Sequence, residues 1–354
     1  MNAHPAATDN PPSRMVLEDV PRLGFDIHMS PFPGSLFSHL TYMGEPADYE
    51  MIMGFTGAPF RRFWDRDDGG NIDLSYLGDE PYRRVFWALG YAWEKVPAER
   101  DAMVAGIRKS LAQGKPAISF GIIGPPEAGL VTGYDEDGAV LHGWSYFQNW
   151  PEYHQPSDAY YTTRDWFEAM DKNAGKGLIL VGDPLPRPSA LELLVSSLVW
   201  AIDLERAPVR ASAGHHIAGL AAYDAWADAL EVDADYPADN PDVLGVRVMV
   251  HGDQCTMTVE RHNAAGFLRK MVAAVPDLDT DAVNHLQAAA ELFDADDRMS
   301  VLWPWGYDMG PEAQRGIAHP ATRRAMAAAI REVRVREAEA VVHLERALSV
   351  LQGR

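Results

Sequence analysis

The stretch KPAISFGIIGPPEAGLVTGYDEDGAVLHGWSYF, residues 115–147, decides the fold that we expect for the first half of this chain. It is rich in β-branched and aromatic residues, and the acidic turn DEDG at 135–138 separates two apolar runs. That combination is typical of a β-hairpin. We therefore predict strands within 115–124 and within 129–147. The apolar segment GLILVG at 177–182 predicts a further buried strand.

Helices are expected on both sides of these strands. Segments 35–44, 81–90 and 99–114 repeat apolar residues at helical spacing, and each ends in a glycine, the residue that most often ends a helix. Several segments within 189–351 carry apolar stripes at the same spacing. The predicted fold class is therefore α+β: helices packed on an antiparallel sheet, followed by an all-α C-terminal half.

A proline-rich break at 184–188 separates the two halves. The first residues are small, polar or proline, which is typical of an unstructured terminus. We therefore predict a flexible tail over 1–18, an α+β domain over 19–186 and a helical domain over 187–354.

The chain has 354 residues, with 31 Lys and Arg against 51 Asp and Glu, and its formal net charge is −20. This balance disfavours binding to nucleic acid or to an anionic membrane, because phosphate contacts need clustered cations. The apolar runs are shorter than the roughly 18 residues of a membrane helix, and no signal peptide is visible. The single cysteine excludes an intramolecular disulfide. We expect a cytoplasmic protein.

Two polar positions in the first half are candidates for chemistry. Ser35 and His39 lie four residues apart near the start of the first predicted helix, and therefore on one helix face. The simpler interpretation is that Ser35 caps the helix and His39 packs. Glu127 lies on the turn GPPE between two predicted strands, where a carboxylate could act as a general base or bind a cation. The simpler interpretation is an exposed loop glutamate.

Histidines and the cysteine gather in the second half. His251, Cys255 and His262 share a predicted helix, and His215 and His216 precede a neighbouring one. Imidazole and thiolate are good ligands for zinc or iron. No carboxylate shares their stripe, so helical packing around a buried cysteine is the better interpretation. We predict no metal site and no cofactor, and we keep a metal-binding helical domain as an alternative.

Aromatic residues are dense in two stretches, 60–64 and 144–150. Such density could line a pocket for an organic ligand, although core packing explains many of these residues equally well. The residues that we predict to contact a substrate are Phe60, Trp64, Trp144 and Tyr146.

Two longer stretches, 31–64 and 110–148, resemble the papain-like cysteine-peptidase fold. They are similar in particular to the peptidases that trim double-glycine leader peptides and to the butirosin-pathway acyltransferases. In that family a cysteine opens the first helix, ahead of a Tyr-x-Gly segment that matches 42–44 here. A histidine begins the strand that runs into a Gly-Tyr-Asp hairpin, which matches 133–135, and an Asp or Asn follows the second hairpin strand. The resemblance covers about the first half of the chain.

The residues that carry the chemistry of that family are replaced in this sequence. The cysteine position holds Ser35, or Gly34 if the register slips by one, and the histidine position holds Glu127. The Asp or Asn position falls at Gly143, beside Trp144. A thiolate nucleophile needs an imidazole to take its proton, so ordinary cysteine-protease or thiol acyltransferase chemistry is excluded at these positions. The resemblance implies the fold and the place of the pocket.

The resemblance leaves two functions open. The first is an enzyme of specialised metabolism acting on an acyl or amide group of an amine-containing substrate, with an acyl carrier protein as a further partner. Ser35 would then be the nucleophile or a positioning hydroxyl, Glu127 the base or the amine-binding carboxylate, and His39 or His142 a proton relay. The second is a non-catalytic ligand-binding or self-resistance protein whose degenerate pocket holds a small cationic compound. The apolar stripe of 321–351 either packs on the helical domain or forms a homodimer.

Overall fold

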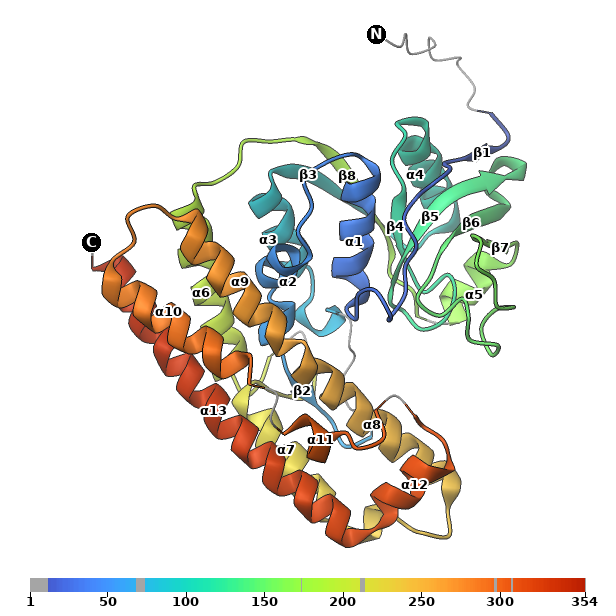
Figure 1. Cartoon of the computed structure of the whole chain (residues 1–354). Coiled ribbons are helices and arrows are strands. Elements are labelled where there is room, and N and C mark those ends of the chain that lie inside the picture. The colour runs from blue at the N-terminus through green and yellow to red at the C-terminus, as the bar shows by residue number, and fades with distance from the viewer. Residues whose placement is uncertain are drawn as a thin grey trace. The chain divides into compact units, whose positions relative to one another are not determined.

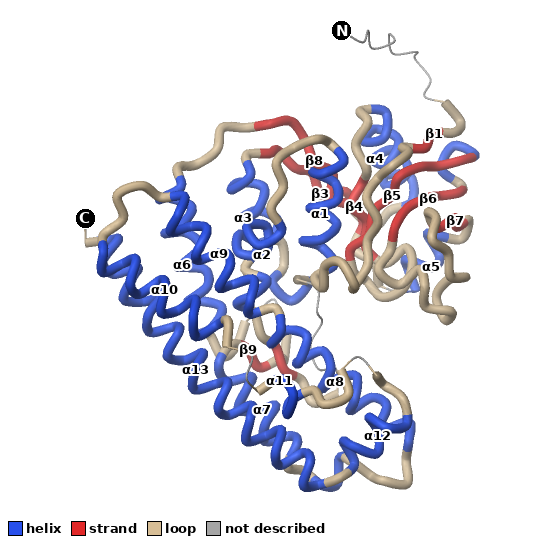
Figure 2. The backbone as a smooth tube through the Cα atoms, viewed as in Figure 1, coloured by secondary structure: helices blue, strands red, loops and turns tan. Residues whose placement is uncertain are grey.

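The computed structural model describes residues 12–67, 74–172, 174–210, 214–295, 298–306 and 308–353, which form two compact units. The sheet unit comprises Met1–Tyr49 and Leu89–Arg187. The helical unit comprises Glu50–Ala88 and Pro188–Arg354. Figure 2 shows that the longer strands belong to the sheet unit, whereas the helical unit is mostly helix.

An antiparallel sheet organises the sheet unit (Figure 1). Its strands follow the order β3-β8-β4-β5-β6-β7, and the short β1 pairs with the C-terminal end of β5. The strands are β1 (Met15–Val16), β3 (Tyr91–Val96), β4 (Ala117–Phe120), β5 (Ala128–Asp135), β6 (Val140–Trp144), β7 (Tyr161–Thr163) and β8 (Gly177–Pro184). The helices of this unit are α1 (Pro31–Tyr42), α4 (Arg100–Ala112) and α5 (Trp166–Lys172).

The predicted hairpin is confirmed as β5 and β6, in which Leu130 lies opposite Trp144. Its turn, η3 (Glu136–Gly138), holds all three residues at positive φ. Asp and Gly tolerate this left-handed backbone better than β-branched residues do, which is why the sequence DEDG turns the chain here.

Helix α4 packs on the sheet through the apolar stripe that its spacing predicts. Met103, Ile107 and Leu111 are buried in one hydrophobic cluster with Val131 and Leu178. Helix α1 packs against β5. The sheet and these two helices therefore enclose the core of the sheet unit.

The helical unit is built along α13 (Pro320–Gln352), which packs against α7 and α10. Its core includes Trp226, Leu244 and Ile330. A short antiparallel ladder joins β2 (Phe63–Trp64) to β9 (Ile217–Ala218). The other elements are α2 (Tyr49–Thr56), η1 (Ala58–Phe60), η2 (Ser75–Leu77), α3 (Glu80–Leu89), α6 (Ala190–Arg206), α7 (Leu220–Leu230), η5 (Asp233–Asp235), α8 (Pro241–Val259), α9 (Arg261–Ala274), α10 (Thr280–Phe293), α11 (Met299–Leu302) and α12 (Pro311–Ala318).

The coarse fold class is confirmed: the chain is mixed α/β, with an antiparallel sheet in its first half and helices in its second. The tail predicted over 1–18 is wrong at its C-terminal end, because Met15 and Val16 pair with β5, and residues 1–11 lie outside the described residues. Segment 50–88, predicted within the 19–186 domain, packs with the helical unit. In the described ranges, no helix is long and apolar enough to span a membrane.

Candidate functional site

Helix α1 places Ser35 in its second turn, where the side chain is fully buried. Ser30, not Ser35, is the N-cap residue. The Oγ atom of Ser35 has no hydrogen-bond partner among the residues that the structure describes. The predicted capping role is therefore wrong, and a buried hydroxyl is left without a partner, which proteins rarely tolerate.

The first turn of α1 offers few donors to an anion. Pro31 and Pro33 carry no N–H, so Phe32 has the only amide donor among the first three helical positions. The N–H of Gly34 already donates to the Ser30 carbonyl at 3.0 Å. An oxyanion hole needs several converging donors, so this helix end is a poor site for one.

Tyr146 lies directly against the first turns of α1. A Cβ atom built on Gly34 would come within 1.9 Å of the Tyr146 hydroxyl oxygen. The tyrosine therefore fills the space that any side chain at position 34 would need. In the papain-like family that the sequence resembles, the nucleophile position aligns with Ser35 or Gly34. If it is Gly34, the Tyr146 hydroxyl fills the space that the nucleophilic side chain would need.

Glu127 is held at the end of the turn that precedes β5. Its N–H donates to the Pro125 carbonyl at 2.7 Å, and its carbonyl accepts from the Gly121 N–H at 3.2 Å. The side chain is 9% exposed, so the carboxylate is largely enclosed and the simple exposed-loop interpretation is wrong. A Cβ atom built on Gly124 in this turn would come within 2.6 Å of Phe147, so the turn packs directly against that side chain.

Five aromatic rings gather next to this turn, and we call them the aromatic cluster: Phe25, Tyr146, Phe147, Trp150 and Tyr153. Phe147 is central, with ring centroids 5.4 Å from Phe25, 5.3 Å from Trp150 and 5.8 Å from Tyr153. Phe25 also contacts Tyr146 at 4.9 Å. Trp150 is 37% exposed and Tyr153 is 42% exposed. The cluster therefore runs from the start of α1 to solvent.

The two candidate relay histidines do not serve this site. His39 is buried, its Nδ1 lies 3.0 Å from the Pro116 carbonyl, and burial lowers its pKa to about 4. The imidazole of His142 is held by Asp135 and Thr162, each at 3.0 Å. It lies opposite Gly133, which is roughly 16 Å along β5 from Ala128 at 3.3 Å per residue. His142 is therefore too far from Glu127 to pass it a proton.

Of the predicted substrate contacts, Tyr146 lies at the site, whereas the other three have packing roles. Trp144 is buried and donates its indole N–H to the Val20 carbonyl at 2.8 Å. Phe60 and Trp64 belong to the helical unit. Phe60 packs edge-on against Phe293 at 5.6 Å, and Trp64 lies in the core of that unit. Core burial accounts for both rings, and a substrate contact for Phe60 and Trp64 stays a prediction.

The histidines and the cysteine of the helical unit are placed for packing. His251 accepts from the Trp226 indole at 3.2 Å and lies 2.6 Å from the Leu302 carbonyl, and burial lowers its pKa to about 4. Burial also raises the pKa of Cys255. Across the described ranges, no group of three or more His, Cys, Asp or Glu side chains is arranged to hold a metal ion. The metal-binding alternative for His215, His216, His251, Cys255 and His262 is therefore unsupported.

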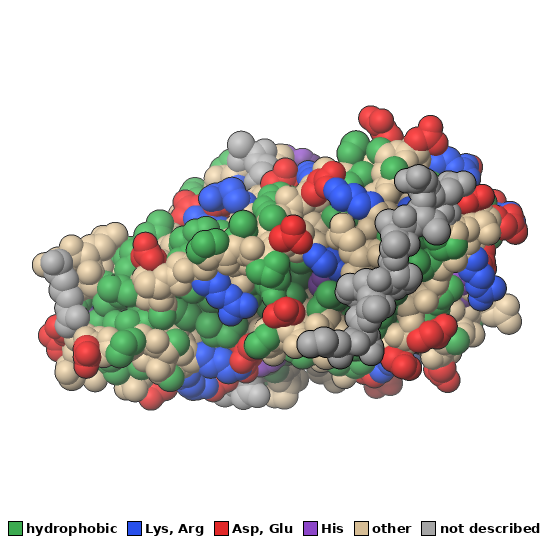
Figure 3. All heavy atoms as spheres, turned by 90° about the horizontal axis from the view of Figure 1, so that it is seen from above, with side chains coloured by type: hydrophobic (Ala, Val, Ile, Leu, Met, Phe, Trp, Pro, Cys, Tyr) green, Lys and Arg blue, Asp and Glu red, His purple; other side chains and the backbone are tan. Residues whose placement is uncertain are grey.

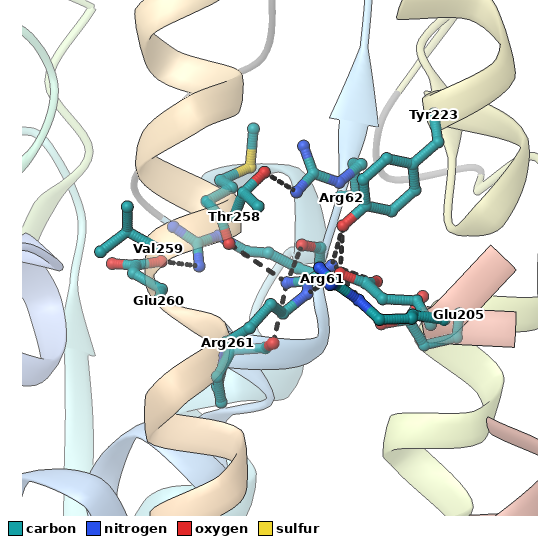
Figure 4. A network of polar contacts seen from close by, with 12 residues as sticks. Arg61, Arg62, Glu205, Tyr223, Thr258, Val259, Glu260 and Arg261 are labelled. Atoms are coloured by element: carbon teal, nitrogen blue, oxygen red, sulfur yellow. Dashed lines mark hydrogen bonds and ion pairs between the residues drawn. The ribbon is translucent and has the colours of Figure 1, made fainter. Parts of the chain in front are cut away.

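A buried ionic network in the helical unit is a feature that the sequence analysis missed (Figure 4). Arg61 pairs with Glu260 at 2.8 Å, and both side chains are fully buried. Arg261 pairs with Glu337 at 2.8 Å and lies 3.5 Å from Glu205. These pairs join the segment after η1 to the α8–α9 junction, to α6 and to α13.

Arg62 completes the network from the same segment. Its guanidinium donates to Gln254 and Thr258 and stacks on the Tyr223 ring, 3.9 Å from the ring centroid. Every charged member is at most 4% exposed. These charges therefore interact with each other and not with solvent. They hold the segment with Arg61 and Arg62 in the helical unit, which explains why residues 50–88 pack there.

A signal for the network does exist in the sequence, because FRRFW at 60–64 places two adjacent arginines inside an apolar stretch. Arginines in such a setting need buried carboxylates or carbonyls as partners. The partners themselves lie about 200 positions further along the chain and could not be chosen in advance. Comparison of the chain with protein-family models and with curated proteins finds no match.

Proposed function

We propose that the sheet unit is a papain-like domain that binds a small, amine-bearing organic molecule beside Glu127 without forming a covalent bond to it. The order of elements supports the fold assignment. A buried helix, α1, packs against β5, and β5 begins directly after Glu127 and runs into the hairpin. This is the arrangement that the resemblance implies.

The aromatic cluster beside an enclosed carboxylate is the observation that carries the proposal. A cation over an aromatic face is attracted by the ring quadrupole, and several rings around one ammonium group are a recurring binding arrangement. Trp150 and Tyr153 are exposed enough to meet a ligand, and the turn that ends at Glu127 packs against Phe147, the central ring of the cluster. The combination matches a protonated or quaternary amine with an apolar body.

The net charge of −20 adds only a weak general attraction for such a cation. On the face drawn in Figure 3, acidic side chains are interspersed with Lys and Arg instead of forming one field. Long-range attraction of this kind is screened within about 10 Å at ordinary salt concentrations. Specific binding must therefore come from Glu127 and the rings that surround it.

Covalent catalysis is disfavoured by what surrounds Ser35. A serine becomes a useful nucleophile when a base accepts its proton and donors stabilise the oxyanion. His39 is committed to the Pro116 carbonyl, and His142 lies at the far end of β5. The two prolines of the first turn also remove amide donors.

The test is a titration with choline and with its neutral isostere 3,3-dimethylbutan-1-ol, followed by tryptophan fluorescence and by NMR line broadening. We expect the cation to bind at least tenfold more tightly than the alcohol, and Glu127→Gln to remove that preference. Glu168→Gln is the control, because Glu168 lies on α5 of the same unit, is 66% exposed and pairs with Arg100. Equal binding of both compounds to the wild-type protein would overturn the proposal.

Acyl transfer is a second candidate, favoured by one observation: the Ser35 hydroxyl is buried without a partner among the described residues. With an acyl thioester, the carbonyl carbon would bond to Ser35 Oγ, the C–S bond would break, and the hydroxyl proton would leave with the thiol. The test is incubation with S-acetyl-N-acetylcysteamine and intact-protein mass spectrometry. An added acetyl group that is absent from Ser35→Ala would support this function, and no mass change in the wild-type protein would refute it.

A further inference from the structure

Two histidines meet where the long helices α10 and α13 pack together in the helical unit. The Nδ1 atoms of His285 and His343 lie 3.0 Å apart, and the ring centroids are 5.1 Å apart. Both side chains are half-buried, so water reaches the pair. Because α10 and α13 share an extensive contact, the two rings are held together before any ligand arrives.

The chemistry of two facing imidazoles restricts what the pair can hold. One Nδ1 can donate a hydrogen bond to the other only if both rings together carry at most three ring protons. Burial, then the neighbouring His285 and Arg346, lowers the pKa of His343, whereas Glu339 acts in the opposite direction. The Nδ1–Nδ1 contact therefore requires at least one neutral ring, the state in which imidazole binds metal ions.

We propose that His285 and His343 form a two-imidazole site for one divalent transition-metal ion, with Cu²⁺ or Ni²⁺ preferred over Zn²⁺. With metal–nitrogen bonds of about 2.0–2.1 Å, two nitrogens 3.0 Å apart subtend an angle of about 91–97° at the metal. Square-planar and octahedral ions place neighbouring ligands at about this angle, whereas tetrahedral zinc prefers a wider one. The donor ring moves its Nδ1 proton to Nε2, so that both rings direct an Nδ1 lone pair toward the shared ion.

The remaining ligands come from water, because both side chains of the pair are only half-buried. This site does not conflict with the finding that no cluster of three or more metal-binding side chains exists in the described part of the chain. Two protein ligands are prearranged, and solvent completes the coordination. A bound ion would clamp α13 to α10.

The test uses the full-length, metal-free protein and CuCl₂. We compare the wild-type protein with His285→Gln, His343→Gln and the control His215→Gln, which alters an imidazole with a 77% exposed side chain elsewhere in the same unit. Calorimetry should give one tight Cu²⁺ per chain, with affinity at least tenfold lower in either pair variant and within twofold of wild type in the control. Bound Cu²⁺ should raise the melting temperature of the wild type and the control only, because the site exists only in the folded chain.

Electron paramagnetic resonance of the one-to-one Cu²⁺ complex gives a second readout, the number of imidazole nitrogens bound to the ion. We expect hyperfine coupling to two imidazole nitrogens in the wild type and to one in each pair variant. A wild-type spectrum with a single imidazole nitrogen, or Cu²⁺ affinity unchanged in both pair variants, would overturn the proposal.

Discussion

Replacing Glu205 with glutamine tests whether the buried network of the helical unit folds with a bound proton. Glu205 lies near the end of α6, is 1% exposed and faces Arg261 and Glu337. Burial, and then the nearby negative charge of Glu337, raises the pKa of Glu205 to about 8. The folded chain therefore holds a proton on this carboxyl at pH 7 that the unfolded chain releases.

The sign of the pH dependence follows from that difference. Because the pKa in the folded state is higher than in the unfolded state, the stabilisation is complete below about pH 4 and is lost as the pH rises toward 8. One proton corresponds to about 1.4 kcal/mol of unfolding free energy for each pH unit inside that window. Glutamine imitates the protonated carboxyl and does not titrate. Glu205→Gln should therefore equal the wild type near pH 5 and exceed it by about 3 kcal/mol at pH 8.

The assay is urea denaturation followed by circular dichroism at half-unit steps from pH 5 to pH 9. Glu345→Gln is the control, because Glu345 pairs with Arg206 on the surface of the same unit and is 41% exposed. The difference in unfolding free energy between Glu205→Gln and the wild type should grow with pH, whereas the difference for the control should stay flat. Parallel curves for Glu205→Gln and the wild type would show that Glu205 is ionised in the folded protein and would refute a bound proton at this carboxyl.

Three further outcomes are expected. Gly34→Ala should lower the unfolding free energy by about 1–3 kcal/mol, because the added Cβ overlaps the Tyr146 hydroxyl. Adding Tyr146→Phe should recover part of that free energy, which a double-mutant cycle of thermal melts would measure. His39 should contribute a loss of about 1.4 kcal/mol of unfolding free energy per unit as the pH drops from 6.5 toward 4, because burial lowers its pKa to about 4. In urea melts over this range, the slope of unfolding free energy against pH should therefore differ by that amount between His39→Gln and the wild type, and equal slopes would contradict a buried neutral imidazole. Arg261→Met should lower the unfolding free energy by about 3–5 kcal/mol, because it removes the arginine that pairs with the buried Glu337. Adding Glu337→Met should restore most of that free energy. A decrease below about 1 kcal/mol in Arg261→Met would contradict the buried pair.

The elements that the sequence predicts well are those whose cause is local. The hairpin turn needs residues that tolerate positive φ, and DEDG supplies them within four positions. The helices of 35–44, 81–90 and 99–114 combine an apolar stripe with a terminal glycine. Such signals depend on residues within one or two turns, so distant contacts do not change them.

The elements that sequence reasoning misplaces depend on distant partners. Segment 50–88 looks like part of the first domain because it lies between two of its segments. It packs with the helical unit because Arg61 and Arg62 find their acceptors at Glu260, Gln254 and Thr258. Isolated buried guanidinium groups would cost several kcal/mol, so the position of the segment is set by those acceptors. Nothing within the segment itself identifies them.

The candidate site shows the same division between spacing and environment. Spacing four places Ser35 and His39 on one face of α1, and the helix is indeed there. What His39 can do is decided by the Pro116 carbonyl, 77 positions away, and by the burial that keeps its imidazole neutral. A helix pattern fixes the face on which a side chain lies, whereas its protonation state follows from neighbours that the pattern does not contain. Glu127 is, for the same reason, a stronger candidate than its sequence position suggests. Its carboxylate becomes enclosed and surrounded by rings only when three distant segments pack together: β5, the loop after β6 and the start of α1.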